Sequence, residues 1–304
     1  MNGTLMNMSL PHNSPPRLPL RGRVRPYVLI PFIITLALLD AWMFYLVGHP
    51  SRDLEVHFLD VGQGDAILIE TPGGVDVLID GGPDRSVLRA LPKKLGLFDR
   101  HIDMVIATHP DKDHVAGLID TLDRYHVSYF MGPGIAHDSS YADALTEAVE
   151  SEPGLTAFVA RRGMRIHLGE GIYADVLFPD RDVTNVETNE GSITLRLTYG
   201  ETSFLMAGDV SSTIEDYLVT LDGEALQSDV LKASHHGSRH STSAAWINAV
   251  RPAVFVVSAG KGNSYGHPAP EVLERARSVG AEIVSTIESG TITFVSDGTH
   301  VERK

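Results

Sequence analysis

The sequence predicts a four-layer α/β fold, in which two mixed β-sheets pack face to face and helices cover their outer sides, preceded by one transmembrane helix. Three observations predict it. Beyond residue 52, short runs rich in Val, Ile, Leu, Phe and Thr alternate with helical patterns, an order typical of sheets covered by helices. Thr71-Pro-Gly-Gly74 is a tight turn of the kind that joins antiparallel strands. An apolar segment occupies residues 27–47, about the length that crosses a bilayer.

The apolar segment sets the predicted topology. Its only charged residue is Asp40, and four Arg precede it, whereas only Arg52 follows it closely. Because basic residues stay on the cytoplasmic side, we expect a single-pass cell-membrane protein with a cytoplasmic N-terminus and an extracytoplasmic domain at 53–304. Residues 1–26 are rich in Pro, Asn and Arg without an apolar period, which predicts a disordered cytoplasmic tail. A cleaved signal peptide is the alternative, although no obvious small-residue cleavage site follows the segment.

Composition limits the chemistry of the chain. There is no cysteine among the 304 residues, so disulfides and thiolate metal sites are excluded, and a metal would need His, carboxylate, Asn or backbone oxygen ligands. Residues 1–52 hold five Arg and one Asp, which leaves 20 basic and 38 acidic residues, a net charge of −18, for residues 53–304. That charge disfavours broad electrostatic capture of nucleic acid. A nuclease would need metal ions and a local basic strip facing its substrate.

The elements of the domain follow from apolar runs bounded by Gly, Pro or Asp. The predicted strands are Glu55–Leu59, Ala66–Glu70, Val75–Ile79, Met104–Ala107, Ser128–Met131, Tyr173–Phe178, Ser192–Tyr199, Ser203–Ala207, Val230–Ala233, Ala253–Ser258, Glu282–Ser285 and Thr291–Val295. The predicted helices are Ser86–Leu95, Val115–Asp123, Tyr141–Ser151, Ser212–Leu221, Ser243–Val250 and Pro270–Val279. Pro270 suits the first turn of its helix.

The strongest chemical signal is the segment 108–114, which lies between a predicted strand and the helix predicted from Val115. Its potential metal ligands are His109, Asp111, Asp113 and His114. Because alternate residues of an extended chain share one side, we expect the first three to point the same way and His114 to join them after a bend. Such a cluster without a cation would repel or remain unsatisfied. The segment therefore predicts a metal site rather than a solvated polar loop.

This segment, THPDKDH, resembles the THxHxDH signature of the metallo-β-lactamase superfamily, with Asp111 in place of the second His. The run Phe58–Asp65, FLDVGQGD, resembles the opening of one branch, the metallo-hydrolase domain of ComEC-type DNA-uptake proteins and its stand-alone relatives. Gly208-Asp209 and the runs LKASHHGS and SAGKGNSYGHP follow in the order of that branch. The resemblance covers about residues 55–296 and implies the αββα metallo-β-lactamase sandwich.

The resemblance also implies a dinuclear metal centre. His109 and Asp111 would hold the first ion, and Asp209 would bridge both ions. The second ion would be held by Asp113, His114 and His235. The ions would be zinc or manganese, and two divalent ions can activate a water molecule and stabilise the oxygen that leaves. Asp113 would also orient that water, which gives it a catalytic role.

One ligand of the superfamily pattern has no counterpart in a matching context, namely a His between the first motif and Asp209. His126, His137 and His167 are candidates by position alone. Asn189 stands where the ComEC-like branch carries an Asn-x-x-Ser segment. The first ion would then have at most three protein ligands, and this oxygen-rich set favours manganese over zinc.

Several neighbouring residues admit two interpretations. His235 and His236 would point apart on an extended segment, and we take His235 as the ligand and His236 as a hydrogen-bond donor or substrate contact. His267, on a Gly-rich loop, is either a catalytic proton donor and phosphate contact or a structural histidine. Lys232 would meet an anionic substrate or remain a solvated charge. The other candidates for substrate contact or ligand orientation are Asp60, Asp65, Asn189 and Asn263, of which the two Asp could equally be turn formers.

These features favour a metal-dependent hydrolase, namely a phosphodiesterase or nuclease that acts on extracytoplasmic DNA and is linked to DNA uptake. Its partner would be DNA, another phosphodiester or an envelope substrate. One alternative is an esterase, lactonase or amidase, because the same centre can activate water against a carbonyl. The other is a non-catalytic metal-binding module, although the nearly complete ligand set argues against it.

Overall fold

The computed structural model describes residues 26–48, 53–96 and 98–304. The chain divides into two compact units, Met1–His49 and Pro50–Lys304. The described part of the first unit is one helix, α1 (Pro26–Gly48), with Pro31 inside it. The predicted tail at 1–26 lies, up to residue 25, outside the described residues.

Helix α1 does not confirm the predicted membrane span. Among the described residues, no helix combines the length and the apolar character needed to traverse a bilayer. The predicted transmembrane helix at 27–47 is therefore wrong. The predicted cell-membrane localisation, with a cytoplasmic N-terminus and an extracytoplasmic domain, depended on it and is wrong as well.

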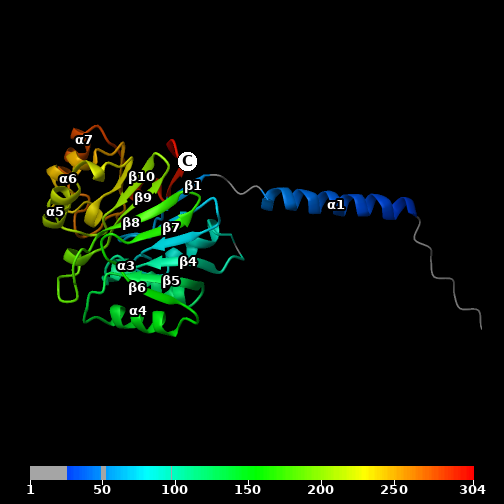
Figure 1. Ribbon diagram of the computed structural model, residues 1–304, viewed down its shortest axis with the longest axis horizontal. Helices are drawn as coiled ribbons and strands as arrows, with labels where there is room; N and C mark the ends of the chain where they lie inside the picture. The colour runs from blue at the N-terminus through cyan, green and yellow to red at the C-terminus, as the bar shows by residue number, and fades with distance from the viewer. Residues whose placement is uncertain (1–25, 49–52, 97) are drawn as a thin grey trace, which may run out of the picture. The chain divides into compact units, whose positions relative to one another are not determined.

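The second unit is a sandwich of two β-sheets with helices on both outer sides (Figure 1). Sheet A has the strand order β15-β14-β1-β2-β3-β4-β5-β6. Its strands are β1 (Leu54–Phe58), β2 (Ile67–Glu70), β3 (Asp76–Ile79), β4 (His101–Ile106), β5 (His126–Gly132), β6 (Thr156–Val159), β14 (Ile292–Ser296) and β15 (Val301–Arg303). Sheet B has the order β13-β12-β11-β10-β9-β8-β7. Its strands are β7 (Arg165–Gly169), β8 (Ile172–Phe178), β9 (Thr194–Tyr199), β10 (Thr202–Met206), β11 (Val230–Lys232), β12 (Val254–Val257) and β13 (Glu282–Ser285).

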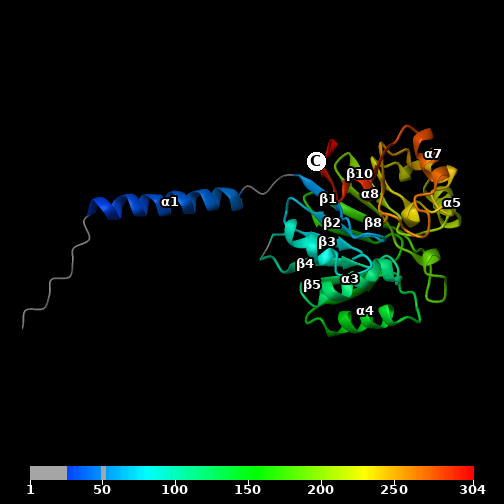
Figure 2. The ribbon, with the colours of Figure 1, turned by 180° about the vertical axis from the view of Figure 1, so that it is seen from behind.

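Three apolar clusters hold the layers together. The central one lies between the sheets and includes Phe58, Phe204 and Phe294, of which Phe58 and Phe294 meet edge-on with ring centroids 5.9 Å apart. A second cluster packs helices against the outer side of sheet A, and a third does so on sheet B (Figure 2). The covering helices are α2 (Val87–Ala90), α3 (Lys112–Leu122) and α4 (Ser140–Ser151) on sheet A, and α5 (Ser212–Asp222), α6 (Ala244–Val250) and α7 (Pro270–Ser278) on sheet B. The predicted two-sheet α/β sandwich is confirmed.

Each sheet contains a parallel part. Strands β3, β4, β5 and β6 run parallel in sheet A, and β10, β11, β12 and β13 do so in sheet B. The carboxyl ends of parallel strands lie along one edge of a sheet, where α/β folds place their ligands. Most of the predicted metal ligands lie on the loops that follow β4, β10 and β11, so the topology brings them to one end of the sandwich.

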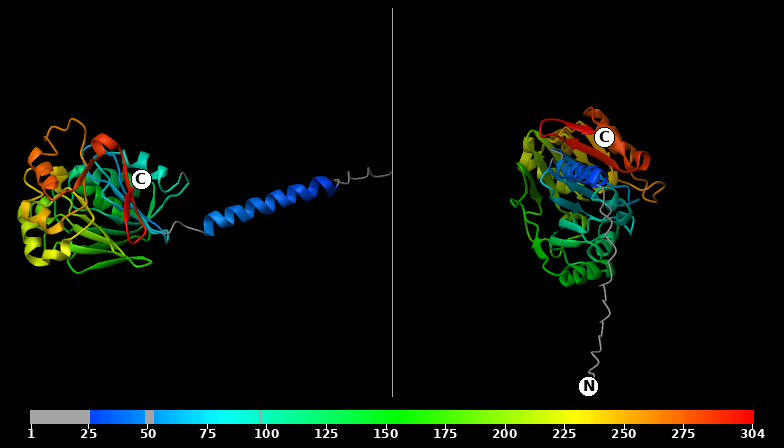
Figure 3. Two further views of the ribbon diagram at one scale, coloured as in Figure 1. Left: turned by 90° about the horizontal axis from the view of Figure 1, so that it is seen from above. Right: turned by 90° about the vertical axis from the view of Figure 1, so that its right-hand side faces the viewer.

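The last strands return to the first one. Strand β14 pairs antiparallel with β1, so segments from near the two ends of the domain lie side by side (Figure 3), and β15 lies on the other side of β14. His57 on β1 lies 2.9 Å from the hydroxyl of Thr293 and 2.6 Å from a carboxylate oxygen of Glu70. Glu55, His57 and Glu70 are close enough together to hold a metal ion. Because both ring nitrogens of His57 already have partners, we interpret this group as a structural ion pair.

Candidate metal centre

Strand β4 leads into a turn that enters helix α3 at Lys112. Asp111 stands just before the helix in an extended conformation, with φ −74° and ψ 147°. Its carbonyl oxygen accepts hydrogen bonds of 3.0 Å from the N–H groups of His114 and Val115. The helix therefore begins three residues before the predicted start at Val115. Asp113 and His114 lie on its first turn rather than on an extended chain, which corrects the expected alternation.

Asp80 anchors this turn from the neighbouring strand β3. Its Oδ2 lies 2.8 Å from Nδ1 of His114 and accepts a 2.7 Å hydrogen bond from the Thr108 hydroxyl. Its Oδ1 accepts a 2.8 Å hydrogen bond from the Thr108 N–H. Asp80 thus fixes the ring orientation of a predicted ligand. Sequence reasoning missed this role, although a carboxylate directly after a strand that runs parallel to β4 was an available signal.

Sheet B supplies Asp209 and two adjacent histidines. Asp209 follows β10 and a Gly208 with φ +52°, and its N–H donates a 3.2 Å hydrogen bond to the hydroxyl of Ser192. His235 and His236 lie in the short 3₁₀ turn η4 (Ser234–Gly237) after β11, with φ of 49° and 55°. Few residues other than glycine adopt this left-handed conformation. Two in succession turn the chain sharply at the end of the strand.

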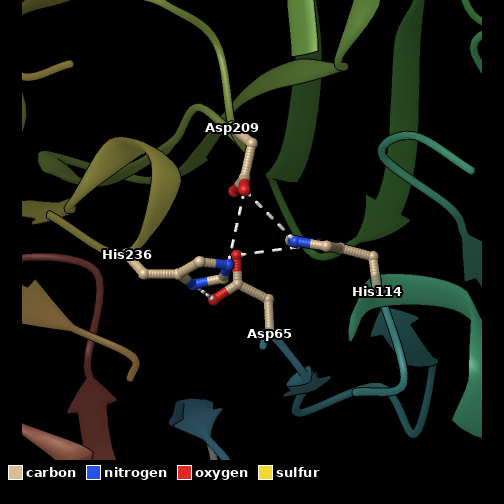
Figure 4. A group of neighbouring side chains, drawn as sticks. All are labelled: Asp65, His114, Asp209 and His236. Atoms are coloured by element: carbon tan, nitrogen blue, oxygen red, sulfur yellow. Dashed lines mark ion pairs between the residues drawn. The ribbon is translucent and has the colours of Figure 1, made fainter. Parts of the chain in front are cut away.

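Side chains from both sheets converge on one point. Figure 4 shows Asp65, His114, Asp209 and His236 facing one another. The Nε2 atoms of His114 and His236 lie 3.4 Å and 3.3 Å from Oδ2 of Asp209. Nε2 of His236 also lies 3.3 Å from Oδ2 of Asp113. Ligand atoms of the four residues in Figure 4 all lie within 4.8 Å of one another, close enough to hold one metal ion.

The two adjacent histidines take different positions. His236 is 1% exposed, and its Nδ1 lies 3.0 Å from the carbonyl oxygen of Ser258, which leaves Nε2 for the cluster. His235 is partly exposed, its Nε2 lies 3.8 Å from Oδ2 of Asp209, and its ring is turned 78° from that of His236. The geometry therefore favours His236 as the ligand, against the expectation for His235. The left-handed backbone at both residues is the reason, because it turns the second ring inward.

Lys232 lies beneath the centre and not on its surface. Its side chain is 1% exposed, and its ammonium group pairs with the buried carboxylate of Asp65. The same group donates a 3.2 Å hydrogen bond to the carbonyl oxygen of Gly208 and lies 3.7 Å from Oδ1 of Asp209. Both expectations for Lys232, a substrate contact or a solvated charge, are therefore wrong. Asp65 is not a simple turn former either, because it supports the cluster through this ion pair.

His109 and Asp111 form a second group of potential ligands beside the cluster. Nε2 of His109 lies 3.6 Å from Oδ2 of Asp111, and Nδ1 of His109 lies 3.0 Å from the hydroxyl of Thr108 and 3.4 Å from that of Ser192. Asn189 begins the short 3₁₀ turn η2 (Asn189–Gly191), just before Ser192. The segment that carries Asn189 therefore borders this group.

Burial and charge shift the pKa values of the cluster. Burial alone would raise the pKa of Asp209, but the charges of His236 and His114 hold it well below its usual value. Burial would lower the pKa values of His114 and His236, yet the carboxylate of Asp209 leads the charges that raise both well above the usual value. Burial and the charge of His114 lower the pKa of His109. Without a bound cation, the imidazoles of His114 and His236 therefore hold protons that balance the carboxylates.

Buried polar atoms without hydrogen-bond partners show whether a metal fits. In the described part of the chain, these atoms include Nε2 of His109, His114 and His236, and Oδ1 of Asn189 and Asp209. Unsatisfied buried groups of this kind are costly and rare. A divalent cation would satisfy them, and imidazole and carboxylate donors suit zinc and manganese. The buried His and Asp side chains are therefore suited to binding metal, and they do not by themselves select one metal.

The remaining predicted residues lie outside the buried cluster. Asp60 is exposed, and its Oδ1 accepts a 3.3 Å hydrogen bond from the N–H of Gly62, as expected of a turn former. Asn263 bonds within its own loop, to Gly260 and His267. The ring of His267 is partly exposed, and its centroid lies 5.7 Å from that of His235. His267 therefore stands at the exposed side of the centre.

Glu215 on α5 holds the loop that follows η4. Its two carboxylate oxygens accept 2.7 Å hydrogen bonds from the N–H groups of Thr242 and Ser243. Burial raises the pKa of Glu215 from 4.5 to about 7. Because the folded state then binds the proton more tightly than the unfolded state, its contribution to stability is complete below pH 4.5 and is lost as pH rises through about 7.

We expect Glu215→Gln to remove this pH dependence. The free energy of unfolding of the wild type should decrease between about pH 4.5 and 8. The decrease in the variant should be smaller by on the order of 3 kcal/mol. Urea unfolding of the metal-free proteins across this range measures the difference. Glu274→Gln on the exposed side of α7 is the matched control. Equal slopes for wild type and Glu215→Gln would contradict the prediction.

The sequence resembles one known protein family and several known proteins. The sequence profile described as the metallo-beta-lactamase superfamily matches residues 59–261. The chain is 28% identical to ComE operon protein 3 of Bacillus subtilis over 272 residues. This alignment covers 83% of this chain and 34% of that protein. It is 28% identical to Competence protein ComA of Neisseria gonorrhoeae over 247 residues. That alignment covers 81% of this chain and 33% of the relative. The chain thus spans about a third of the length of these relatives.

Solved structures share the fold. Igni18, a metallo hydrolase from Ignicoccus hospitalis, matches with a TM-score of 0.52 and 17% identity, over 80% of this chain and 98% of that one. CmlA, a diiron β-hydroxylase from Streptomyces venezuelae, matches with a TM-score of 0.52 and 14% identity, over 84% of this chain and 55% of that one. At these identities the matches establish a common architecture and leave the reaction open.

Proposed function

The chain belongs to the metallo-β-lactamase superfamily, and on that premise we propose that it is a metal-dependent phosphodiesterase that cleaves DNA in connection with DNA uptake. The observation that carries the proposal is the buried cluster of Asp65, His114, Asp209 and His236. It occurs in a chain whose relatives include one named as a competence protein. DNA is accordingly the proposed partner.

We propose a revised ligand set for two divalent ions, zinc or manganese. The second ion would be held by Asp113, His114 and His236, with His236 in place of His235. Asp209 would be shared, because its carboxylate lies 3.3–3.4 Å from two ligands of the second ion and its charge also acts on His109 of the first. The first ion would be held by His109 and Asp111, with the unpartnered Oδ1 of Asn189 as a further oxygen ligand in place of the absent histidine.

The charges around the centre support two ions. Five carboxylates and one ammonium group give a net charge of −4, which two divalent cations would cancel if the imidazoles are neutral. These groups are Asp65, Asp80, Asp111, Asp113, Asp209 and Lys232. A single divalent cation would leave a net charge of −2 among these side chains, of which Asp111 and Asp113 are partly exposed.

Different side chains of this protein would have different roles in the proposed reaction. Two divalent ions supply an activated water molecule and positive charge for the oxygen that leaves. Asp113, which is partly exposed on the first turn of α3, would orient the attacking water. Asp80 holds the ring of His114, and Lys232 holds Asp65 beneath the cluster. His267, at the exposed side, would donate a proton to the leaving group or contact the phosphate.

A comparison of substrates tests the proposal. The protein, loaded with manganese or zinc, is assayed on single-stranded DNA, bis-p-nitrophenyl phosphate and nitrocefin. We expect cleavage of the two phosphodiesters and little or no turnover of nitrocefin. Turnover of nitrocefin alone would reject the proposed reaction. Absence of any turnover by protein shown to contain metal would instead support a metal-binding module without catalysis.

Hydrolysis of a small ester, lactone or amide is a second candidate. A cavity of about 340 Å³ is lined by His109 and Pro110 and by side chains from α4, β5 and β6. Phe130 and Leu145 are among its mainly apolar lining residues, and cavities of this size suit small molecules. Turnover of p-nitrophenyl esters or lactones without cleavage of phosphodiesters would favour this candidate.

Metal binding should depend on pH. The carboxylates raise the pKa values of His114 and His236 well above 6.5, so both imidazoles carry a proton near neutral pH that a metal must displace. We therefore expect weaker metal binding at about pH 6 than at about pH 8, and release of protons on binding. Titration calorimetry in two buffers with different ionisation enthalpies measures both effects. Affinity that is independent of pH, without proton release, would contradict the prediction.

A further inference from the structure

Tyr265 places an exposed aromatic ring beside the metal centre. Its side chain is 69% exposed, and its ring stacks on that of His267, with centroids 5.8 Å apart and planes inclined by 18°. The ring of His267 meets that of His235 at 5.7 Å and 72°, and Nε2 of His235 lies 3.8 Å from Oδ2 of Asp209. A continuous series of rings therefore leads from solvent to the metal ligands.

The loop that carries Tyr265 is fixed at both ends. The side-chain amide of Asn263 donates hydrogen bonds to the carbonyl oxygens of Gly260 (2.9 Å) and His267 (2.6 Å), and its Oδ1 accepts one of 3.0 Å from the His267 N–H. The N–H of Gly260 donates a 3.1 Å hydrogen bond to the side chain of Gln63. A Cβ atom at Gly260 would lie 2.7 Å from the backbone nitrogen of Gln63. This close packing fixes the loop that carries the ring before a substrate binds, which lowers the entropy cost of binding.

Because the domain is acidic, stacking on bases is a more suitable source of affinity for nucleic acid than electrostatic attraction of its phosphates. Residues 53–304 carry a net charge of −18, so counterion release cannot supply most of the affinity for a polyanion. Base–aromatic stacking needs no net positive charge and tolerates any base sequence. The exposed side chains of Lys261 and Arg239 lie near Tyr265 and His236 in the sequence and add only local basic charge.

We propose that Tyr265, backed by His267, stacks on the base of the nucleotide next to the scissile phosphodiester. The centre would then prefer strands with accessible bases over base-free phosphodiesters. This inference rests on the proposed phosphodiesterase function. It assigns to Tyr265 a role in selecting the substrate that is separate from metal binding.

Two oligonucleotides with equal backbone charge test the inference. One is a thymidine oligomer, and the other has the same length but carries abasic residues throughout. We expect the manganese-loaded wild type to cleave the thymidine oligomer with a kcat/KM about 10-fold higher, the effect typical of one base–aromatic stack. In Tyr265→Ala the ratio of the two kcat/KM values should fall to about one, mainly through KM, and Tyr265→Phe should restore it.

A second measurement does not depend on turnover. Fluorescence anisotropy of labelled oligomers with the metal-free full chain should show the same preference in wild type and its loss in Tyr265→Ala. Phe98→Ala is the matched control, because Phe98 is 92% exposed and precedes β4 at the end opposite the metal centre. A preference that persists in Tyr265→Ala, in binding or in cleavage, overturns the inference. If the wild type cleaves neither oligomer, the proposed phosphodiesterase reaction is wrong. The role of Tyr265 is then decided by the binding measurement alone, that is, by the ratio of affinities for the two oligomers.

Discussion

Replacing Asp209 with asparagine should lower the rate of hydrolysis by at least ~10³-fold, which corresponds to about 4 kcal/mol of lost transition-state stabilisation. The carboxylate lies 3.3 Å from His236, 3.4 Å from His114 and 3.7 Å from the ammonium group of Lys232. An amide would keep the shape but remove one negative charge from the point where both proposed ions meet. We therefore expect weaker binding of both ions, seen as a loss of metal in elemental analysis of the purified variant.

Asp60→Asn is the matched control for this substitution. Asp60 is exposed and forms a turn at the end of β1, so the variant should keep its metal and its rate. Circular dichroism and thermal unfolding would show that Asp209→Asn remains folded. Wild-type activity and metal content in Asp209→Asn would remove the basis for a shared ligand at this position.

Replacing Lys232 with methionine should destabilise the metal-free protein by about 3–5 kcal/mol, because it leaves the buried carboxylate of Asp65 without its partner. Both side chains are at most 2% exposed, so water cannot replace the ammonium group. The double variant Lys232→Met/Asp65→Asn removes both charges and should recover a large part of the loss. Urea unfolding of the two variants and the wild type measures these differences.

Lys261→Met provides the comparison at an exposed lysine, where the change in unfolding free energy should stay within about 0.5 kcal/mol. A loss below about 1 kcal/mol for Lys232→Met would show that the ion pair has little effect on stability. A double variant no more stable than Lys232→Met would show that the cost comes from packing rather than from the unpaired charge.

Strands with a buried apolar run could be predicted from the sequence, and two exposed edge strands could not. Strands β2, β3 and β12 are apolar runs whose residues are mostly buried, so their composition reveals them. Strand β6 lies at the edge of sheet A, and all four of its residues are exposed. Strand β7 lies at the edge of sheet B with mostly polar or exposed residues. Without a buried face, neither strand carries the alternation that predicts a strand.

The metal centre was predictable where its ligands are close together in sequence. His109, Asp111, Asp113 and His114 lie within six residues, and their residue types alone indicate metal chemistry. The choice between His235 and His236 depends on two successive left-handed backbone conformations, which residue types do not reveal. The burial of Lys232 depends on Asp65, which lies 167 positions earlier in the chain and on the other sheet. Long-range contacts of this kind are not visible in local patterns.

The pairing of β14 with β1 has a consequence for the order of folding. The contact between His57 and Thr293 joins residues 236 positions apart, so β14 is synthesised long after β1. Closing so long a loop is slow and entropically costly. Until it closes, the backbone N–H and C=O groups along one side of β1 have no neighbour from β14 and could pair with another chain. Sheet A is therefore completed only after the residues that separate β1 from β14 have been synthesised.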